Sequence, residues 1–80
     1  MSYINNAEFK MPFFEILKDI MIDKNLNQTQ LANIIGVKQS QVSEWLKGKS
    51  KPGYDSLKAI CINLNISADV LLGLDDKQKF

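Results

Sequence analysis

The sequence predicts an all-α fold, a compact single domain of five short helices. Two observations indicate it. Apolar residues recur at i, i+3, i+4 and i+7 along most of the chain, and no segment shows the alternation of a strand. Eighty residues suffice for one small core. We expect the domain to cover residues 12–74, between an N-terminal segment (1–11) that is loosely ordered or contacts a partner and a polar C-terminal tail (75–80).

The first helix is predicted to begin at Pro12 and to end at Asn25, with Leu26 packing back onto it. Proline suits the first helical position, where the missing N–H has no acceptor to bind. The apolar stripe of this helix consists of Phe13, Ile16, Leu17, Ile20 and Met21. Two further apolar residues, Phe14 and Ile22, lie off this stripe. Either the N-terminal segment, with Tyr3, Ile4 and Phe9, folds over that side, or it joins a partner subunit.

A second helix is predicted over residues 28–35, because Gly36 suits the left-handed position after a helix end. A third helix starts near Lys38 or Gln39 and stops at Gly48. Its apolar side consists of Val42, Trp45 and Leu46. The loop "KSKPG" follows, since the residue before a proline avoids helical geometry.

The fourth helix is predicted over residues 54–64. Its buried stripe consists of Leu57, Ile60, Cys61 and Leu64, so the thiol should be inert. Ser67 is expected to cap a last short helix that Gly73 closes. The apolar residues of that helix are Val70, Leu71 and Leu72.

The composition argues against an enzyme. Histidine is absent, which removes the usual general base and the commonest metal ligand, and we expect neither a cofactor nor a metal. Glu15, Asp19 and Asp23 lie four residues apart on one helical stripe, which is typical of a solvated face. One cysteine fits a reducing cytoplasm. No signal peptide or membrane-spanning run is evident, so a cytoplasmic location is expected.

The positive charge is concentrated in one region. The net charge is only +1, and all ten basic residues are lysines. Residues 38–58 include five lysines and only two acidic residues. The lysines are Lys38, Lys47, Lys49, Lys51 and Lys58. Such a cluster is either a solvated loop or a surface for a polyanion.

The spacing around Gly36 is typical of two helices that meet steeply across a short turn. The first helix needs a small residue, Ala32, where the second crosses it, and the turn needs a residue that adopts positive φ. Apolar residues on both sides then lock the pair to the core. The structural set is Leu31, Ala32, Ile35, Gly36, Val37, Val42 and Trp45. With Val42 and Trp45 facing inward, the polar residues of the third helix face outward.

These motifs resemble the XRE-type helix-turn-helix family, which includes the lambdoid phage repressors and Cro proteins. The resemblance is carried by "NQTQLANIIGVKQSQVSEWLKGKSKP" and "LKAICINLNISADVLLG" and covers about residues 13–74. It implies a lambda-repressor-like fold with the helix-turn-helix at the second and third helices. Met21 and Leu46 depart from some phage repressors, which carry an internal Arg–Glu ion pair at these two places.

The resemblance implies which residues contact DNA, since the third helix of this family enters the major groove. The expected base contacts are Gln39, Ser40, Ser43 and Glu44. The expected phosphate contacts are Asn27, Gln28, Lys38, Gln41, Lys49, Ser50, Lys51 and Tyr54. Alternatives remain for three of these: Gln39 merely begins the helix, Glu44 is a solvated residue, and Asn27 acts only as a cap. Trp45 occupies a position that faces the core in this family, so we expect it to pack in the core rather than to stack on a base.

The resemblance also implies a sequence-specific regulator that binds a double-stranded DNA operator. We expect a repressor that acts by operator occupancy, as a homodimer on a pseudo-palindrome. The C-terminal stretch "ADVLLGL" either forms the dimer interface or simply closes the core. The alternative is an antitoxin or adaptor module whose main partner is another protein. Only residues 1–11 and 75–80 offer a surface for that partner.

Overall fold

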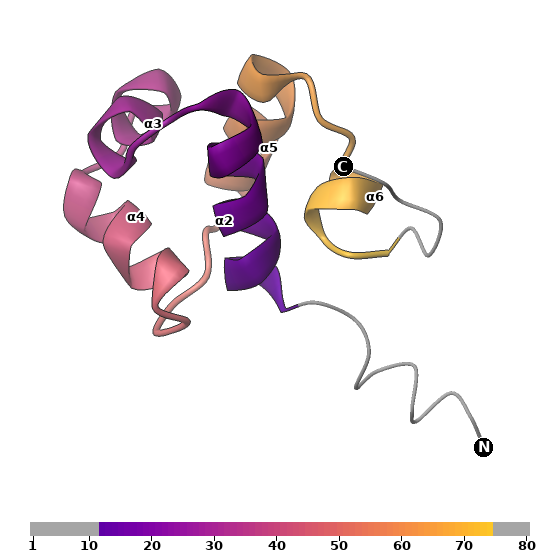
Figure 1. Cartoon of the computed structure of the whole chain (residues 1–80), viewed down its shortest axis with the longest axis horizontal. Helices are drawn as coiled ribbons and strands as arrows, with labels where there is room; N and C mark the ends of the chain where they lie inside the picture. The colour runs from indigo at the N-terminus through magenta and orange to yellow at the C-terminus, as the bar shows by residue number, and fades with distance from the viewer. Residues whose placement is uncertain (1–11, 75–80) are drawn as a thin grey trace.

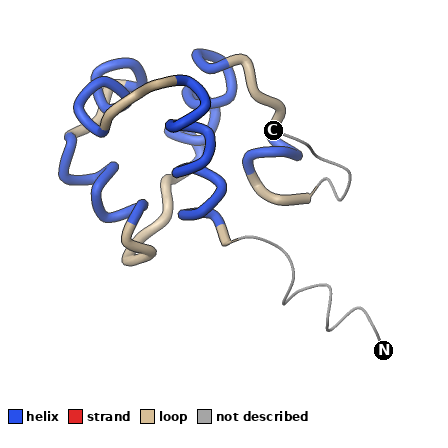
Figure 2. The backbone as a smooth tube through the Cα atoms, viewed as in Figure 1, coloured by secondary structure: helices blue, strands red, loops and turns tan. Residues whose placement is uncertain are grey.

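A computed structural model describes residues 12–74 of the chain. Within this range the backbone forms five α-helices joined by loops, and no strand (Figures 1 and 2). The helices are α2 (Phe13–Lys24), α3 (Gln28–Ile35), α4 (Gln39–Leu46), α5 (Tyr54–Leu64) and α6 (Ala68–Leu71). The predicted all-α fold is thereby confirmed. None of the helices in residues 12–74 is long and apolar enough to cross a membrane.

Local capping residues set most of the helix ends. Asn25 and Asn65 end α2 and α5 in the left-handed conformation, with φ of 59° and 56°. Asparagine tolerates this conformation better than most residues. The Ser67 side chain accepts a hydrogen bond from the Val70 N–H at 3.2 Å and so caps α6. These caps can be recognised in the sequence. The predicted C-terminal end of α2 and both predicted ends of α3 and α5 are confirmed.

Three predicted boundaries were wrong by one or two residues. Pro12 is the N-cap of α2 rather than its first helical residue, because its ψ of 157° is extended. The last residue of α4 is Leu46, and Gly48 follows with φ of 75°. Leu72 lies just beyond α6 and is 45% exposed. In each case the helix end belongs to a turn whose geometry depends on the following residues.

The core lies where α2 crosses the other helices. Its eleven buried side chains are Ile16, Leu17, Ile20, Met21, Leu31, Ala32, Val42, Trp45, Ile60, Leu64 and Leu71. The predicted full burial of Leu57 and Cys61 was wrong, since both are only half-buried at the edge of this small core. Even so, partial burial raises the pKa of the Cys61 thiol, because desolvation disfavours the thiolate.

The helices contact one another in a ring, in the order α3, α4, α2, α6, α5 and back to α3. In Figure 1, α3 and α4 lie to the left of α2 and α6 lies to its right, with α5 partly behind α2. Phe14, predicted to lie off the main stripe, packs against Gly48, whereas Ile22 is 72% exposed. Tyr3, Ile4 and Phe9 lie outside the described residues. This packing fixes the position of α4, whose outward face carries most of the candidate site.

Two glycines allow a matched test of this architecture. Gly36 has φ of +80° and open space where a Cβ would lie, whereas a Cβ on Gly48 (φ +75°) would lie 3.2 Å from Phe14 Cδ2. We expect Gly36→Ala to lower the free energy of unfolding by about 1–2 kcal/mol, the cost of a left-handed Cβ. Gly48→Ala should cost more, because the phenylalanine ring must also shift. Urea unfolding monitored by circular dichroism measures both, and equal losses would contradict the Phe14 contact.

Candidate nucleic-acid interface

The crossing of α3 and α4 is set by a short turn and one small side chain. The N–H groups of Gly36 and Val37 both donate to the Ala32 carbonyl oxygen, at 2.8 and 3.0 Å. Ala32 is 2% exposed, and Leu31 and Val42 are fully buried beside it in the core. Ile35 and Val37 are partly buried and pack against that core. A buried alanine leaves room for close approach, so the two helices are held as one rigid unit.

The outward face of α4 carries short polar and amide side chains. Gln39, Ser40 and Glu44 are exposed, whereas Val42 and Trp45 point into the core. Ser43 is half-buried at the margin of the helix. The face therefore presents three exposed polar side chains and one partly covered hydroxyl.

A hydrogen bond links the two helices at their first turns. Gln39 Nε2 donates to Gln28 Oε1, so the first residue of α4 contacts the first residue of α3. Gln28 is half-buried and Gln39 is exposed. The bond uses only one of the two Nε2 hydrogens of Gln39 and none of the Gln28 amide hydrogens. Both amides thus keep donors and acceptors available on the outer surface.

Side chains also form hydrogen bonds with backbone N–H groups at the N-termini of α3 and α4. The Asn27 carboxamide oxygen accepts from the Gln30 N–H at 2.7 Å, and the Gln30 Oε1 accepts from the Asn27 N–H at 2.9 Å. This reciprocal pair is a capping box. At α4, Gln41 Oε1 accepts from the Lys38 N–H at 3.2 Å. Gln41, expected to bind phosphate, therefore has a structural role as well, and its amide hydrogens remain available.

The loop after α4 brings lysines alongside the helix. Lys47, Lys49 and Lys51 are exposed. Half-buried Ser50 donates its hydroxyl to Glu44 Oε1 at 3.5 Å, which is a long hydrogen bond between the loop and α4. The loop that carries these lysines is therefore joined to the polar face of α4 by this contact.

An exposed aromatic residue begins α5 next to this loop. Tyr54 is 74% exposed, and Lys58 Nζ lies 6.0 Å from its ring centroid. This distance is at the limit of a cation–π interaction. Lys58 follows Tyr54 by one helical turn, and this spacing is the sequence signal from which the pair could have been predicted.

The surface made by α3, α4 and the loop is equipped for hydrogen bonding and for anions, not for metal binding. Within residues 12–74 no three metal-ligating side chains come together. Two helix N-termini, at Gln28 and Gln39, add unpaired backbone N–H groups, which favour anions. Amide side chains at the same ends recognise base edges well.

Comparison with known proteins identifies the architecture. Residues 17–71 match a family model described as Helix-turn-helix. The chain belongs to the helix-turn-helix family. In this family's terms, α3 and α4 form the helix-turn-helix, and α4 is the recognition helix. The domain is therefore of a DNA-binding type.

A curated relative matches the helix-turn-helix region and beyond. It is the "HTH-type transcriptional activator BcrR" of Enterococcus faecalis, 39% identical over 62 residues. The alignment covers 78% of this chain and 30% of the relative. The chain thus matches less than a third of the relative's length.

Two substitutions test whether the Asn27 side chain caps α3. Asn27→Ala removes the cap and should lower the free energy of unfolding by about 1 kcal/mol. Asn27→Asp keeps an oxygen for the Gln30 N–H and a negative charge near the helix N-terminus, so stability should be retained. Thermal unfolding of both variants, with exposed Thr29→Ala as the control, measures this. Equal destabilisation by alanine and aspartate would contradict a capping role.

Proposed function

We propose that this helix-turn-helix protein is a sequence-specific repressor of transcription that occupies a double-stranded DNA operator as a homodimer. The observation that carries the proposal is the Gln28–Gln39 hydrogen bond at the entrance of the recognition helix. It joins a side chain suited to read a base with one suited to bind the backbone. The proposal therefore gives residues 12–74 the role of the DNA-binding domain, with residues 1–11 and 75–80 outside it.

Gln39 is the proposed base reader. With one Nε2 hydrogen held by Gln28, the second hydrogen and the Oε1 oxygen remain free. These two atoms match adenine, whose N7 accepts and whose N6 amine donates in the major groove. Gln28 in turn keeps both of its amide hydrogens for a phosphate oxygen. One hydrogen-bonded pair would thus couple base recognition to backbone positioning.

Ser40, Ser43 and Glu44 are proposed to extend the readout along α4. The Glu44 carboxylate suits the N4 amine of cytosine, which is a donor in the major groove. Its only side-chain hydrogen bond among the described residues is the long one from Ser50, so the carboxylate can still accept from a base. Half-buried Ser43 has the shortest reach of the three, so its share of the specificity should be smallest.

The backbone contacts are proposed to flank this readout on both sides. Asn27 and Gln28 lie at the start of α3, and Lys38 and Gln41 lie at the start of α4. On the other side lie Lys49, Ser50, Lys51 and Tyr54 of the loop and the start of α5. Exposed lysines near the recognition helix supply attraction that does not depend on sequence.

Two copies are proposed to bind a pseudo-palindromic operator. Dimers of this motif contact half-sites about one helical turn apart. The C-terminal segment 68–74 is the proposed interface, because Leu72 and Leu74 remain 45% and 62% exposed. Leu71 of the same segment is fully buried in the core. The segment can therefore close the core and still offer apolar surface to a partner.

An activator is the second candidate, because the matched relative is named a transcriptional activator. Both candidates need operator binding by α4 and differ in what the bound protein does to transcription. An in vitro transcription assay on the bound promoter distinguishes them by the direction of the change. An antitoxin or adaptor role would instead require a protein partner, and binding to DNA alone would then be weak.

The central prediction concerns Gln39→Ala. We expect it to weaken binding to the operator by about 1–3 kcal/mol, roughly 5- to 150-fold, because one bidentate base contact is lost. Binding to a scrambled duplex should hardly change. Fluorescence anisotropy with the upstream DNA of the protein's own gene measures both affinities across a range of salt concentrations.

The salt dependence of this variant provides its internal control. The slope of log K against log salt should be the same in wild type and Gln39→Ala, since no phosphate contact is removed. Lys49→Met should behave in the opposite way. It should weaken operator and scrambled DNA alike and reduce the slope by about 0.9. Loss of slope in Gln39→Ala, or equal affinity of the wild type for both duplexes, would refute base readout by Gln39.

The proposed dimer interface at segment 68–74 can be tested by substitution of Leu74. Leu74→Glu should lower the affinity for a two-half-site operator far more than for a single half-site, because it places like charges opposite one another between subunits. Exposed Ile62→Glu, on α5, is the matched control. Analytical ultracentrifugation of the protein–DNA complex measures the stoichiometry. Two protomers per operator in both variants, with equal affinities, would exclude segment 68–74 as the interface.

A further inference from the structure

A groove opens beside the recognition helix. It lies between the start of α2, the end of α4, the following loop and Leu72, and its volume is about 420 Å³. Volumes of roughly 300–1,000 Å³ are typical of small-molecule sites. Three aromatic side chains, Phe13, Phe14 and Trp45, form much of its wall.

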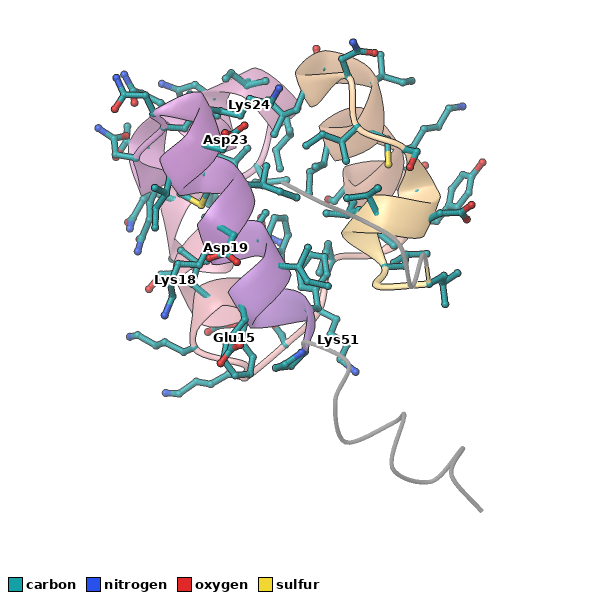
Figure 3. The ribbon with its side chains drawn as sticks, turned by 45° about the vertical axis from the view of Figure 1, so that its right-hand side comes forward. Glu15, Lys18, Asp19, Asp23, Lys24 and Lys51 are labelled. Atoms are coloured by element: carbon teal, nitrogen blue, oxygen red, sulfur yellow. The ribbon has the colours of Figure 1, made fainter. Side chains whose placement is uncertain are left out.

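The side chains that line the groove carry one positive charge, and the carboxylate of Glu44 lies 3.5 Å from the Ser50 hydroxyl. Aliphatic surface comes from Leu57 and Leu72 and from two prolines, and the polar side chains are Ser50 and Lys51. Figure 3 shows Lys51 close to the N-terminal end of α2, where the groove lies. An apolar wall with a single ammonium group and a hydroxyl is complementary to an apolar molecule that carries one carboxylate.

Gly48 contributes to the shape of this wall. It lies in contact with Phe14, and a Cβ at this position would approach the ring to 3.2 Å. The same glycine begins the loop that carries Ser50 and Lys51. A molecule that fills the groove would therefore contact the base of the loop as well as its two polar side chains.

We propose that this groove binds a small apolar carboxylic acid, with the carboxylate at Lys51 and Ser50 and the apolar body against Phe13, Phe14 and Trp45. Binding of the acid weakens the binding of DNA. The effect on DNA binding rests on the proposed function, in which Lys51 and Ser50 contact a phosphate. Binding of the acid to the groove does not depend on the proposed function.

The coupling follows from shared groups. One Lys51 ammonium cannot neutralise the ligand carboxylate and a DNA phosphate equally well at the same time. The Ser50 hydroxyl also donates to Glu44 Oε1 at 3.5 Å, so a ligand carboxylate that takes this hydrogen displaces that weak contact. By linkage, the acid weakens DNA binding by the same factor by which DNA weakens binding of the acid.

The first experiment measures binding without DNA. 2-Naphthoate is titrated into ¹⁵N-labelled protein, and the neutral isostere 2-naphthamide is titrated in parallel. We expect saturable shifts of the backbone amides of Phe14, Gly48 and Leu72 with the acid. Binding of the amide, and binding of the acid to Lys51→Met, should be about three- to fivefold weaker, as suits one exposed ion pair. Absence of saturable shifts, or equal binding of acid and amide, overturns the proposal.

A matched pair of variants localises the site. Leu72 lines the groove, whereas Ile62 of α5 does not, and both are exposed apolar residues. Leu72→Glu should abolish the shifts because it places a carboxylate in the groove, whereas Ile62→Glu should leave them unchanged. The spectra of both variants also report directly whether each is folded. Unchanged binding in a folded Leu72→Glu variant overturns the site.

The second experiment measures coupling. Saturating 2-naphthoate should lower the affinity for the operator about threefold or more and reduce the salt slope by about 0.9, equivalent to one phosphate contact. In Lys51→Met this effect should disappear. If the acid binds the groove but wild-type DNA affinity is unchanged, the regulatory half of the proposal is wrong. If no DNA binds at all, the proposed function fails, while the naphthoate shifts still decide the groove.

Discussion

The close approach of α3 and α4 at Ala32 is the constraint on which the candidate interface depends. The Ala32 carbonyl accepts two N–H groups of the turn, and its methyl group is buried against the core. A larger side chain at this position would push the helices apart. α4 has only eight residues, so Val42 and Trp45 are its only fully buried side chains. Val42 and Trp45 lie three residues apart on this short helix, so a change in the crossing would turn the whole polar face with them.

The Gln28–Gln39 bond extends this rigidity to two side chains that are proposed to contact DNA. A free glutamine loses about 1.5–2 kcal/mol of rotamer entropy when it is fixed. Because the two amides already restrain each other, part of that loss occurs during folding rather than on binding. Pre-organisation of this kind improves affinity without adding contacts. In the proposed complex, Gln28 would also influence base recognition without touching a base, through the orientation of Gln39.

The sequence predicted the helices well because their signals are local. Asn27 with Gln30, Gly36 and Ser67 each lie within four residues of the helix end that they define. The half-burial of Ser43, Leu57 and Cys61 could not be predicted, because it depends on neighbours that are distant in sequence. The same holds for the Phe14–Gly48 contact, which joins residues 34 positions apart. The Gln28–Gln39 bond spans 11 positions and depends on two long side chains choosing matching rotamers. The residue types were enough to predict a candidate site, whereas the hydrogen bonds between its side chains could be found only in the structure.

Charge explains why one lysine can matter for this protein. A net charge of +1 gives little long-range attraction to DNA, so in the proposed complex the few lysines beside α4 would supply most of the electrostatic binding. With only a handful of such contacts per subunit, removal of one would be a large fraction of the total. In the proposed homodimer, two copies on one operator would double the number of contacts and therefore the salt slope, and a ligand that occupies Lys51 in both copies would act twice.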